Sequence, residues 1–257
     1  AKQLGRLRDH VAGKLEEAGW LAGCGGELVG VGGAIRNLAA ATQRMEGKPE
    51  FGVQGYTLKR RALDELVGVL ASMSTEERRS VPGIKPARGD IILAGAIVVE
   101  QVLEAGGFKG ARVTEAGLRE GVFLERLLAD RPEPLFEDVR AASVVNLASQ
   151  YDPHAAHTRH VAALALSLFD DLGEAGLHPA DPTERELLWA ACLLHDIGVA
   201  INYDDHHKHS RYLILNAGLP GFSQREMALI GQVVRFHRKG QPSPGPFESL
   251  MKPGDQE

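Results

Sequence analysis

The chain has 257 residues, of which 44% are hydrophobic and 25% charged, close to the average of soluble folded proteins. No apolar run approaches the roughly 18 residues of a membrane helix, and the N-terminus lacks the uninterrupted apolar stretch of a signal peptide. Two cysteines, Cys24 and Cys192, cannot supply a disulfide framework, and a net charge of -5 gives no reason to expect nucleic acid as a partner. We therefore expect a cytoplasmic globular protein without membrane or nucleic-acid partners.

The first half of the chain alternates short strand patterns with helical ones. Apolar residues recur at helical spacing from Leu4 to Leu15, and Ser74-Thr-Glu-Glu77 matches a capping box. Strands are predicted at 27–33, 51–58 and 111–114, and helices at 35–45, 59–73, 90–105 and after Gly117-Leu-Arg-Glu-Gly121 up to about 130. Three strands are few for an open α/β sheet, so this α+β region is predicted to be part of a domain.

The second half carries only helical patterns. Arg131-Pro-Glu-Pro134 makes a natural boundary because both prolines disfavour a continuing helix. Helices are predicted at 137–149, 157–172, 183–197, 206–215 and 223–237, and a Pro/Gly-rich tail from about 241 is predicted to be loose. The sequence thus predicts an α+β unit over residues 1–130 and an all-helical unit over residues 131–257.

Nine of the ten histidines lie from His154 to His237, around the pair His195–Asp196 at the end of an apolar helix. Imidazole and carboxylate together suit a divalent Mn, Fe, Co or Zn ion. The candidate metal ligands, which four separate predicted helices contribute, are His157, His195, Asp196, His206 and His237. Asp196 is also the candidate catalytic residue of the helical unit. Any single histidine is more often structural, so the prediction depends on the cluster.

Two regions are candidate phosphate sites. Near the histidines, the cations Lys208, Arg238 and Lys239 could hold phosphate. In the first half, Gly30-Val-Gly-Gly33 leads from a strand into a helix, and the backbone of Gly32 and Gly33 with Arg36 could bind phosphate at the helix N-terminus. A tight strand-to-helix turn explains these glycines equally well.

In their order along the chain, these motifs resemble the exopolyphosphatase/guanosine pentaphosphatase (Ppx/GppA) family. The residues from Gly30 to Arg36, Arg88-Gly-Asp90 and Gly117–Gly121 resemble its second actin-like (ribonuclease H-like) lobe. Leu-Leu-His195-Asp-Ile-Gly, His206-His-Lys-His-Ser and Arg-Phe-His237-Arg-Lys-Gly resemble its HD-type helical domain. The resemblance extends over residues 27–242.

The resemblance implies a phosphatase that removes terminal phosphate from polyphosphate or guanosine pentaphosphate, with Mg²⁺ in a cleft between two lobes. It also implies a homodimer. The family's Asp-x-Gly-Gly-Gly-Ser loop and glutamate base are not found in this sequence, so the resemblance implies an incomplete actin-like part without its first lobe, whose catalytic residues stay unknown. Val31 and Ala34 replace the family's hydroxyl residues, and the late aspartate of HD enzymes has no counterpart except Asp255 in the tail.

Three functions stay open on these grounds. The first is the family's phosphatase activity. The second is an HD-type metal-dependent nucleotide or phosphoester hydrolase that acts alone. The third is a phosphate-binding or dimerisation module without catalysis. The histidine cluster favours an enzyme. The absence of the Asp-x-Gly-Gly-Gly-Ser loop and of the glutamate base favours a module without catalysis.

Overall fold

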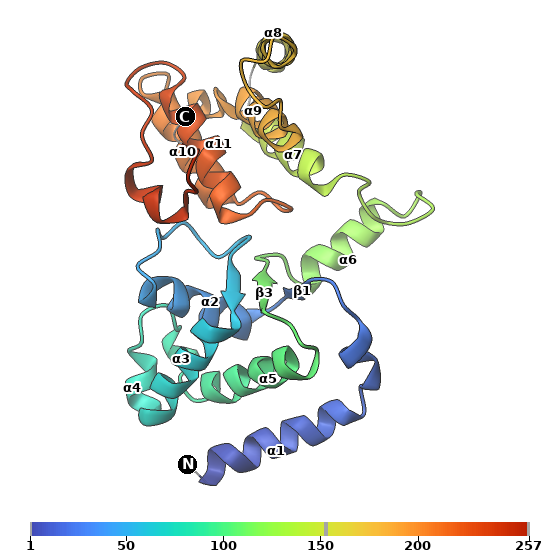
Figure 1. Cartoon of the computed structure of the whole chain (residues 1–257), viewed down its shortest axis with the longest axis vertical. Coiled ribbons are helices and arrows are strands. Elements are labelled where there is room, and N and C mark those ends of the chain that lie inside the picture. Colours follow the sequence, from blue (N-terminus) through green and yellow to red (C-terminus); the bar gives the residue numbers. More distant parts are fainter. Residues whose placement is uncertain (1, 152–153, 256–257) are drawn as a thin grey trace. The chain divides into compact units, whose positions relative to one another are not determined.

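The computed structural model describes residues 2–151 and 154–255, and the chain divides into two compact units, Ala1–Leu135 and Phe136–Glu257 (Figure 1). The sequence places this boundary near residue 130. Within the described residues, no helix is both long and apolar enough to cross a membrane.

The N-terminal unit is built on a small mixed sheet with the strand order β1-β3-β2. β1 pairs with β3 in parallel, with Leu28 opposite Ala111, and β2 pairs with β3 antiparallel, with Leu58 opposite Ala111. The elements are α1 (Lys2–Glu16), η1 (Gly19–Gly23), β1 (Leu28–Gly30), α2 (Gly33–Met45), β2 (Thr57–Lys59), α3 (Arg60–Ser72), α4 (Thr75–Arg79), η2 (Pro86–Arg88), α5 (Ile92–Ala105), β3 (Gly110–Val113) and α6 (Leu118–Leu127). Strands form in all three predicted regions, and the helices between them are confirmed. β1 and β2 are shorter than the segments 27–33 and 51–58 that predict them, and β2 begins six residues later than predicted, whereas β3 differs by one residue at each end.

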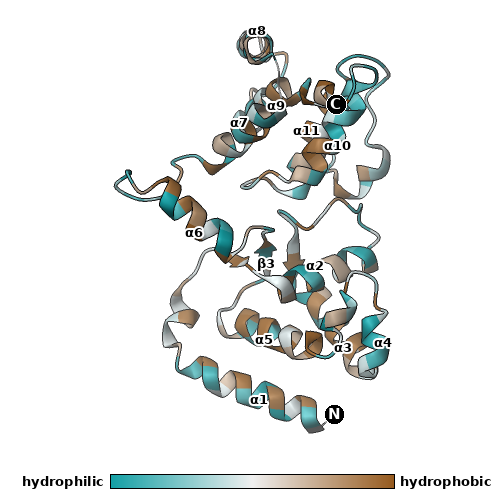
Figure 2. Cartoon of the chain, turned by 180° about the vertical axis from the view of Figure 1, so that it is seen from behind, coloured by the Kyte–Doolittle hydropathy of each residue, from teal (hydrophilic) through white to brown (hydrophobic). Residues whose placement is uncertain are grey.

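The core of this unit comes from the apolar faces of α2, α3 and α5, which pack on one another. Leu38, Leu63 and Ile97 are fully buried there. α1 lies along α5, and hydrophobic and hydrophilic residues alternate along it (Figure 2). The Arg8 guanidinium makes two hydrogen bonds, of 2.7 and 2.8 Å, to the Glu100 carboxylate and so ties α1 to α5.

The C-terminal unit is helical throughout its described residues. Its elements are α7 (Val139–Tyr151), α8 (Ala155–Glu174), α9 (Pro182–Leu194), η3 (Ile197–Ala200), α10 (His206–Ala217), α11 (Gln224–Phe236) and η4 (Gly245–Leu250). α9 starts cleanly because the Asp181 carboxylate accepts a hydrogen bond from the Thr183 amide and Pro182 occupies the first turn. α9 contacts α7, α8 and α11, so it is the central helix of this unit.

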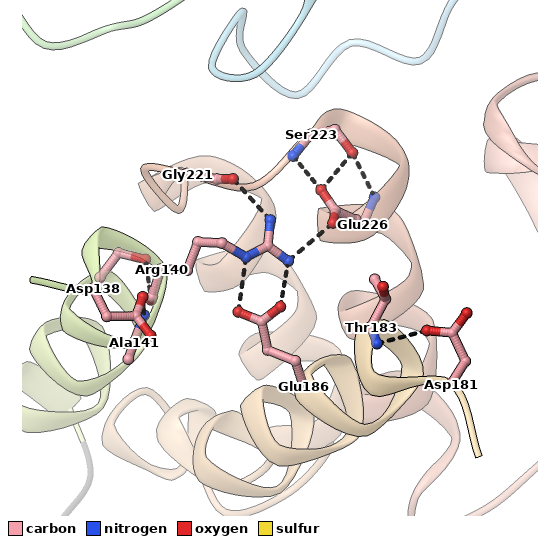
Figure 3. Close-up of polar contacts among 10 residues, drawn as sticks. Asp138, Arg140, Ala141, Asp181, Thr183, Glu186, Gly221, Ser223 and Glu226 are labelled. Atoms are coloured by element: carbon pink, nitrogen blue, oxygen red, sulfur yellow. Dashed lines mark hydrogen bonds and ion pairs between the residues drawn. The ribbon is translucent and has the colours of Figure 1, made fainter.

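A partly buried ionic network holds α7, α9 and α11 together (Figure 3). Arg140 of α7 donates two hydrogen bonds, of 2.7 and 2.8 Å, to the Glu186 carboxylate of α9 and one of 2.9 Å to Glu226 of α11. It also donates to the Gly221 carbonyl, and its guanidinium lies 3.9 Å from the centre of the Phe222 ring. One arginine thereby joins three helices and the loop that precedes α11.

The C-terminal segment is more ordered than its Pro/Gly-rich sequence predicts. It contains the short helix η4, whose Phe247 is buried. Asp255 makes an ion pair with Arg225 of α11. The prediction of a loose tail considers only local turn chemistry, and it misses these two long-range anchors.

Candidate metal centre and phosphate loop

The His195–Asp196 pair lies where α9 ends. α9 finishes at Leu194, three residues earlier than the predicted end, because Asp196 leaves the helical backbone with φ -105° and ψ 1°. This change of direction lets two neighbouring side chains turn toward one point, which a continuous helix does not allow. His195 Nε2 lies 3.4 Å from Asp196 Oδ2, and the side chains are 11% and 20% exposed.

Asp196 is the centre of a cluster that contains all five predicted metal ligands. His157 Nε2 lies 3.9 Å and His195 Nε2 3.4 Å from Asp196 Oδ2. His206 Nε2 lies 3.2 Å and His237 Nε2 4.0 Å from Asp196 Oδ1. The ligand atoms therefore form two sets that share Asp196, one with His157 and His195, the other with His206 and His237.

Three of the imidazoles are held in place by a hydrogen bond from the opposite side of the ring. Nδ1 lies 2.8 Å from the Cys192 carbonyl in His195, 2.9 Å from the Tyr203 carbonyl in His206, and 2.7 Å from the Val234 carbonyl in His237. A carbonyl oxygen only accepts, so each Nδ1 carries a hydrogen, and in the neutral form of the ring Nε2 then presents a lone pair. This arrangement is typical of histidines that bind metal through Nε2.

The donor set fits a divalent cation. The Nε2 atoms of His206 and His237 are 3.2 Å apart, and both face Asp196 Oδ1. Two lone pairs and a carboxylate oxygen repel one another at this range unless a proton or a cation lies among them. Burial lowers the pKa of His237, and the imidazoles of His195 and His206 lower it further, which favours the neutral, ligating form.

Ser210 of α10 fixes the turn that carries the pair. Its buried hydroxyl donates to the His195 carbonyl at 2.7 Å and accepts from the Gly198 amide at 2.8 Å. Gly198 has no room for a side chain, because a Cβ there would collide with the His206 carbonyl and the Ser210 amide. The turn that follows α9 and the first turn of α10 are thus in direct backbone contact.

The variant Ser210→Ala is expected to lower the free energy of unfolding of the C-terminal unit by about 1–3 kcal/mol, because a buried amide and a buried carbonyl lose their partner. Urea unfolding followed through Trp189 of α9, in a Trp20→Phe background, measures this loss. Ser149→Ala is the matched control, since the exposed Ser149 hydroxyl donates to the Asn146 carbonyl. Equal losses in the two variants would contradict this role.

His207 is the fully buried neighbour of the cluster. Its two ring nitrogens have no hydrogen-bond partner within the described part of the chain. Burial, with the charge of Arg235, lowers its pKa to about 4, so His207 is neutral at pH 7. His207 belongs to neither ligand set, and its Nε2 lies 4.0 Å from Asp205 Oδ1.

The predicted phosphate-binding cations gather around Asp205 and Tyr203. Lys208 Nζ lies 2.7 Å and Lys239 Nζ 3.7 Å from the Asp205 carboxylate, and the Arg238 guanidinium lies 5.4 Å from the centre of the Tyr203 ring. Asp205 has φ 59°, which aspartate tolerates better than most residues. The Asp205 carboxylate offsets part of the local positive charge, and no pattern in the sequence assigns a role to Asp205.

Asp255 does not complete the ligand set, because it pairs with Arg225. Asp204 is exposed, and its amide donates to the Asn202 side chain. Within residues 2–151 and 154–255, the metal-ligand groups are therefore the two sets that share Asp196.

In the N-terminal unit, the glycine loop forms the start of α2 as predicted. Gly32 precedes α2 with φ 111°, a conformation that favours glycine. Arg36 donates through Nε to the Gly32 carbonyl and through Nη1 to the Glu115 carbonyl, at 3.1 Å each. Gly33 and Arg36 line a cavity of about 490 Å³ at this helix N-terminus.

Two further cations at this cavity were missed from the sequence. Lys85 and Arg88 also line it, and a Cβ at Gly33 would lie 2.9 Å from Arg88 Nη2. The side chain of Asn37 holds the Lys85 loop on α2, because it accepts from the Lys85 amide and donates to the Gly33 carbonyl, at 2.6 Å each. In the sequence, the only indication of a role for Arg88 is that it lies in the motif Arg88-Gly-Asp90, which is part of the family resemblance.

Sequence comparison identifies relatives of both units. The family model of the Ppx/GppA phosphatase family matches residues 1–130. A second family model, that of Ppx/GppA phosphatase, domain III, matches residues 139–252. The guanosine-5'-triphosphate,3'-diphosphate pyrophosphatase of Pseudoalteromonas translucida (strain TAC 125) is 29% identical over 195 residues, which are 76% of this chain and 36% of that protein. The Vibrio vulnificus (strain YJ016) protein of the same name is 28% identical over 164 residues, 64% of this chain and 32% of that protein. The chain spans about a third of the length of these curated relatives.

A solved structure of the Aquifex aeolicus member of the Ppx/GppA protein family is also similar. It is 24% identical with a TM-score of 0.43, over 51% of this chain and 42% of that one. The family assignment comes from the two family models, which together extend over most of the chain. The chain therefore belongs to the Ppx/GppA phosphatase family.

Proposed function

We propose that this chain belongs to a metal-dependent phosphohydrolase that releases terminal phosphate from guanosine pentaphosphate or polyphosphate. The observation that carries the proposal is the convergence of four imidazole Nε2 atoms on the Asp196 carboxylate. The names of the relatives, guanosine-5'-triphosphate,3'-diphosphate pyrophosphatases, support a guanosine polyphosphate as substrate.

The C-terminal unit would act as an HD-type metal centre. His157, His195 and Asp196 would hold one divalent ion, and Asp196, His206 and His237 a second, with Mn, Fe, Co or Zn as the suitable elements. When bound there, a divalent ion supplies a Lewis acid for phosphate oxygens and for water. Lys208, Arg238 and Lys239 would attract the anionic substrate to this side of the unit.

The N-terminal unit would be the second actin-like lobe of the family. Gly32, Gly33, Arg36, Lys85 and Arg88 would hold a phosphate at the start of α2, with Mg²⁺ as counterion. The lining supports this role, because it contains three cations, Arg36, Lys85 and Arg88, against one acid, Glu115. The catalytic residues of that lobe's cleft stay unassigned, and a homodimer stays a prediction that sedimentation would test.

Elemental analysis and phosphate release together test the proposal. The purified chain should carry about one or two divalent ions, as HD-type sites do. It should release phosphate from guanosine pentaphosphate or tripolyphosphate when Mn²⁺, Zn²⁺ or Mg²⁺ is supplied. A chain that binds the metal and stays silent would indicate a phosphate-binding or dimerisation module. A chain that binds no metal would refute the metal centre.

A further inference from the structure

A cavity of about 600 Å³ lies between α11 and the C-terminal segment, in the C-terminal unit. Sites for small organic molecules have about 300–1,000 Å³. The cavity is lined by Leu229, Gln232, Val233, Phe236, His237, Pro242, Ser243, Pro244, Met251 and Asp255.

His237 connects this cavity to the histidine cluster. Its ring lines the cavity, and its Nε2 lies 3.2 Å from His206 Nε2 and 4.0 Å from Asp196 Oδ1. An imidazole ring is only a few ångströms across, so a group that binds at the cluster has the cavity beside it. A phosphate at the cluster would therefore place its substituent at the cavity.

The chemistry of the lining excludes a second run of phosphates as this substituent. None of the lining residues is a lysine or an arginine, and the charged one, Asp255, is acidic. Its carboxylate already accepts from Arg225 and the Lys252 amide. The Gln232 amide is also engaged, since it accepts from Arg211 and donates to the Ser243 carbonyl. What the cavity offers is apolar surface, including the ring of Phe236.

We propose that this cavity holds the nucleoside of a nucleotide whose phosphate lies at the His–Asp cluster. The proposal rests on the proposed metal centre and narrows its substrate class to nucleotides, which have a planar apolar base, in contrast to inorganic polyphosphate. Phe236 and Val233 would contact the base.

Methionine NMR tests the proposal directly. Of the four methionines, Met251 lines the cavity, Met45 and Met73 lie in the N-terminal unit, and Met227 is buried in α11. In the Zn²⁺-loaded chain labelled at methionine methyl carbons, guanosine 5′-monophosphate should shift the Met251 signal, assigned with Met251→Leu. Met45 and Met73 should not move. Inorganic tripolyphosphate should leave Met251 in place; an equal shift with tripolyphosphate, or none with the nucleotide, overturns the proposal.

The variant Val233→Trp fills the cavity without removing a buried group, because Val233 is 49% exposed. It should weaken binding of guanosine 5′-monophosphate at least tenfold and leave the zinc content unchanged. Val145→Trp is the matched control, at a 51% exposed valine on α7 away from the cavity lining. Equal affinities for the two variants would overturn the proposal.

Binding of guanosine, which has no phosphate, tests the cavity assignment independently of the proposed metal centre. Added to the metal-free chain at millimolar concentration, it should shift Met251 in the wild type and not in Val233→Trp. If zinc fails to bind while guanosine still shifts Met251, the metal centre is refuted and the cavity assignment stands. If zinc binds and guanosine leaves Met251 unmoved, the cavity assignment is refuted alone.

Discussion

Replacing Asp196 by asparagine is expected to abolish metal binding by the C-terminal unit. Asp196 is the one residue present in both ligand sets, with one oxygen facing each. Asparagine keeps the shape but removes the charge, and its amide nitrogen cannot bind a cation. Loss of a group that only hydrogen-bonds to a metal ligand typically lowers metal affinity about 10–100-fold. Loss of the ligand that both sets share should therefore lower the affinity by more than about 100-fold.

Thermal unfolding with and without zinc measures this effect. Zinc at one hundred times its Kd should stabilise the wild type by about 2.7 kcal/mol, and Asp196→Asn should lose this increment. Asp204→Asn is the control, because Asp204 is exposed and lies outside both ligand sets. A variant that keeps its zinc and its thermal shift would refute Asp196 as the shared ligand.

Replacing Arg140 by alanine is expected to destabilise the C-terminal unit by about 3–5 kcal/mol, since it leaves two partly buried carboxylates without their partner. The side chains of Arg140, Glu186 and Glu226 are 25%, 31% and 16% exposed. Burial alone would lower the pKa of Arg140, but its hydrogen bonds to both glutamates raise it above the ordinary arginine value. The arginine is thus charged at every pH at which the protein folds.

The loss should shrink in acid. Burial would raise the pKa of Glu226, but hydrogen bonds from Arg140 and Ser223 hold it below the ordinary value. A lowered carboxyl pKa adds stability that is complete above the unfolded pKa of about 4.3 and disappears as the pH falls through the folded pKa. Urea unfolding at pH 7 and near pH 4 should therefore show a larger gap between wild type and Arg140→Ala at pH 7.

Arg185→Ala provides the matched comparison for Arg140→Ala. Arg185 also makes two hydrogen bonds to one carboxylate, that of Asp170, but both side chains are nearly half exposed. Such a pair is worth about 0–1 kcal/mol. If the two arginine variants lost equal stability, the three-helix network would have no special role.

The sequence predicted the elements well where the signal is local. Periodicity located the helices, and the capping box at Ser74 is present, with the Glu77 amide donating to the serine hydroxyl and the Glu77 carboxylate accepting from the serine amide. The His195–Asp196 pair was predicted at a helix end, and the chain bends there. These features depend on residues within a few positions of one another.

The features that the sequence did not predict depend on residues far apart in the chain. Arg140 meets Glu186 and Glu226 across 46 and 86 positions, and no periodicity predicts this pairing. Lys85 reaches the start of α2 through the side chain of Asn37, 48 positions earlier. The cavity beside His237 exists because the C-terminal segment folds back on α11. Long-range packing of this kind has no short sequence pattern.

The Nδ1 hydrogen bonds of the histidine cluster have a consequence for how ions exchange. His195, His206 and His237 are already oriented, so a metal ion does not have to immobilise these rings. His157 is 56% exposed, and no such bond to its ring occurs within the described residues. The proposed ion of the set of Asp196, His206 and His237 should therefore be released slowly, whereas that of the set with His157 should exchange freely with solvent ions. Brief dialysis against a chelator should remove the ion of the His157 set first and leave a chain with one slowly released metal.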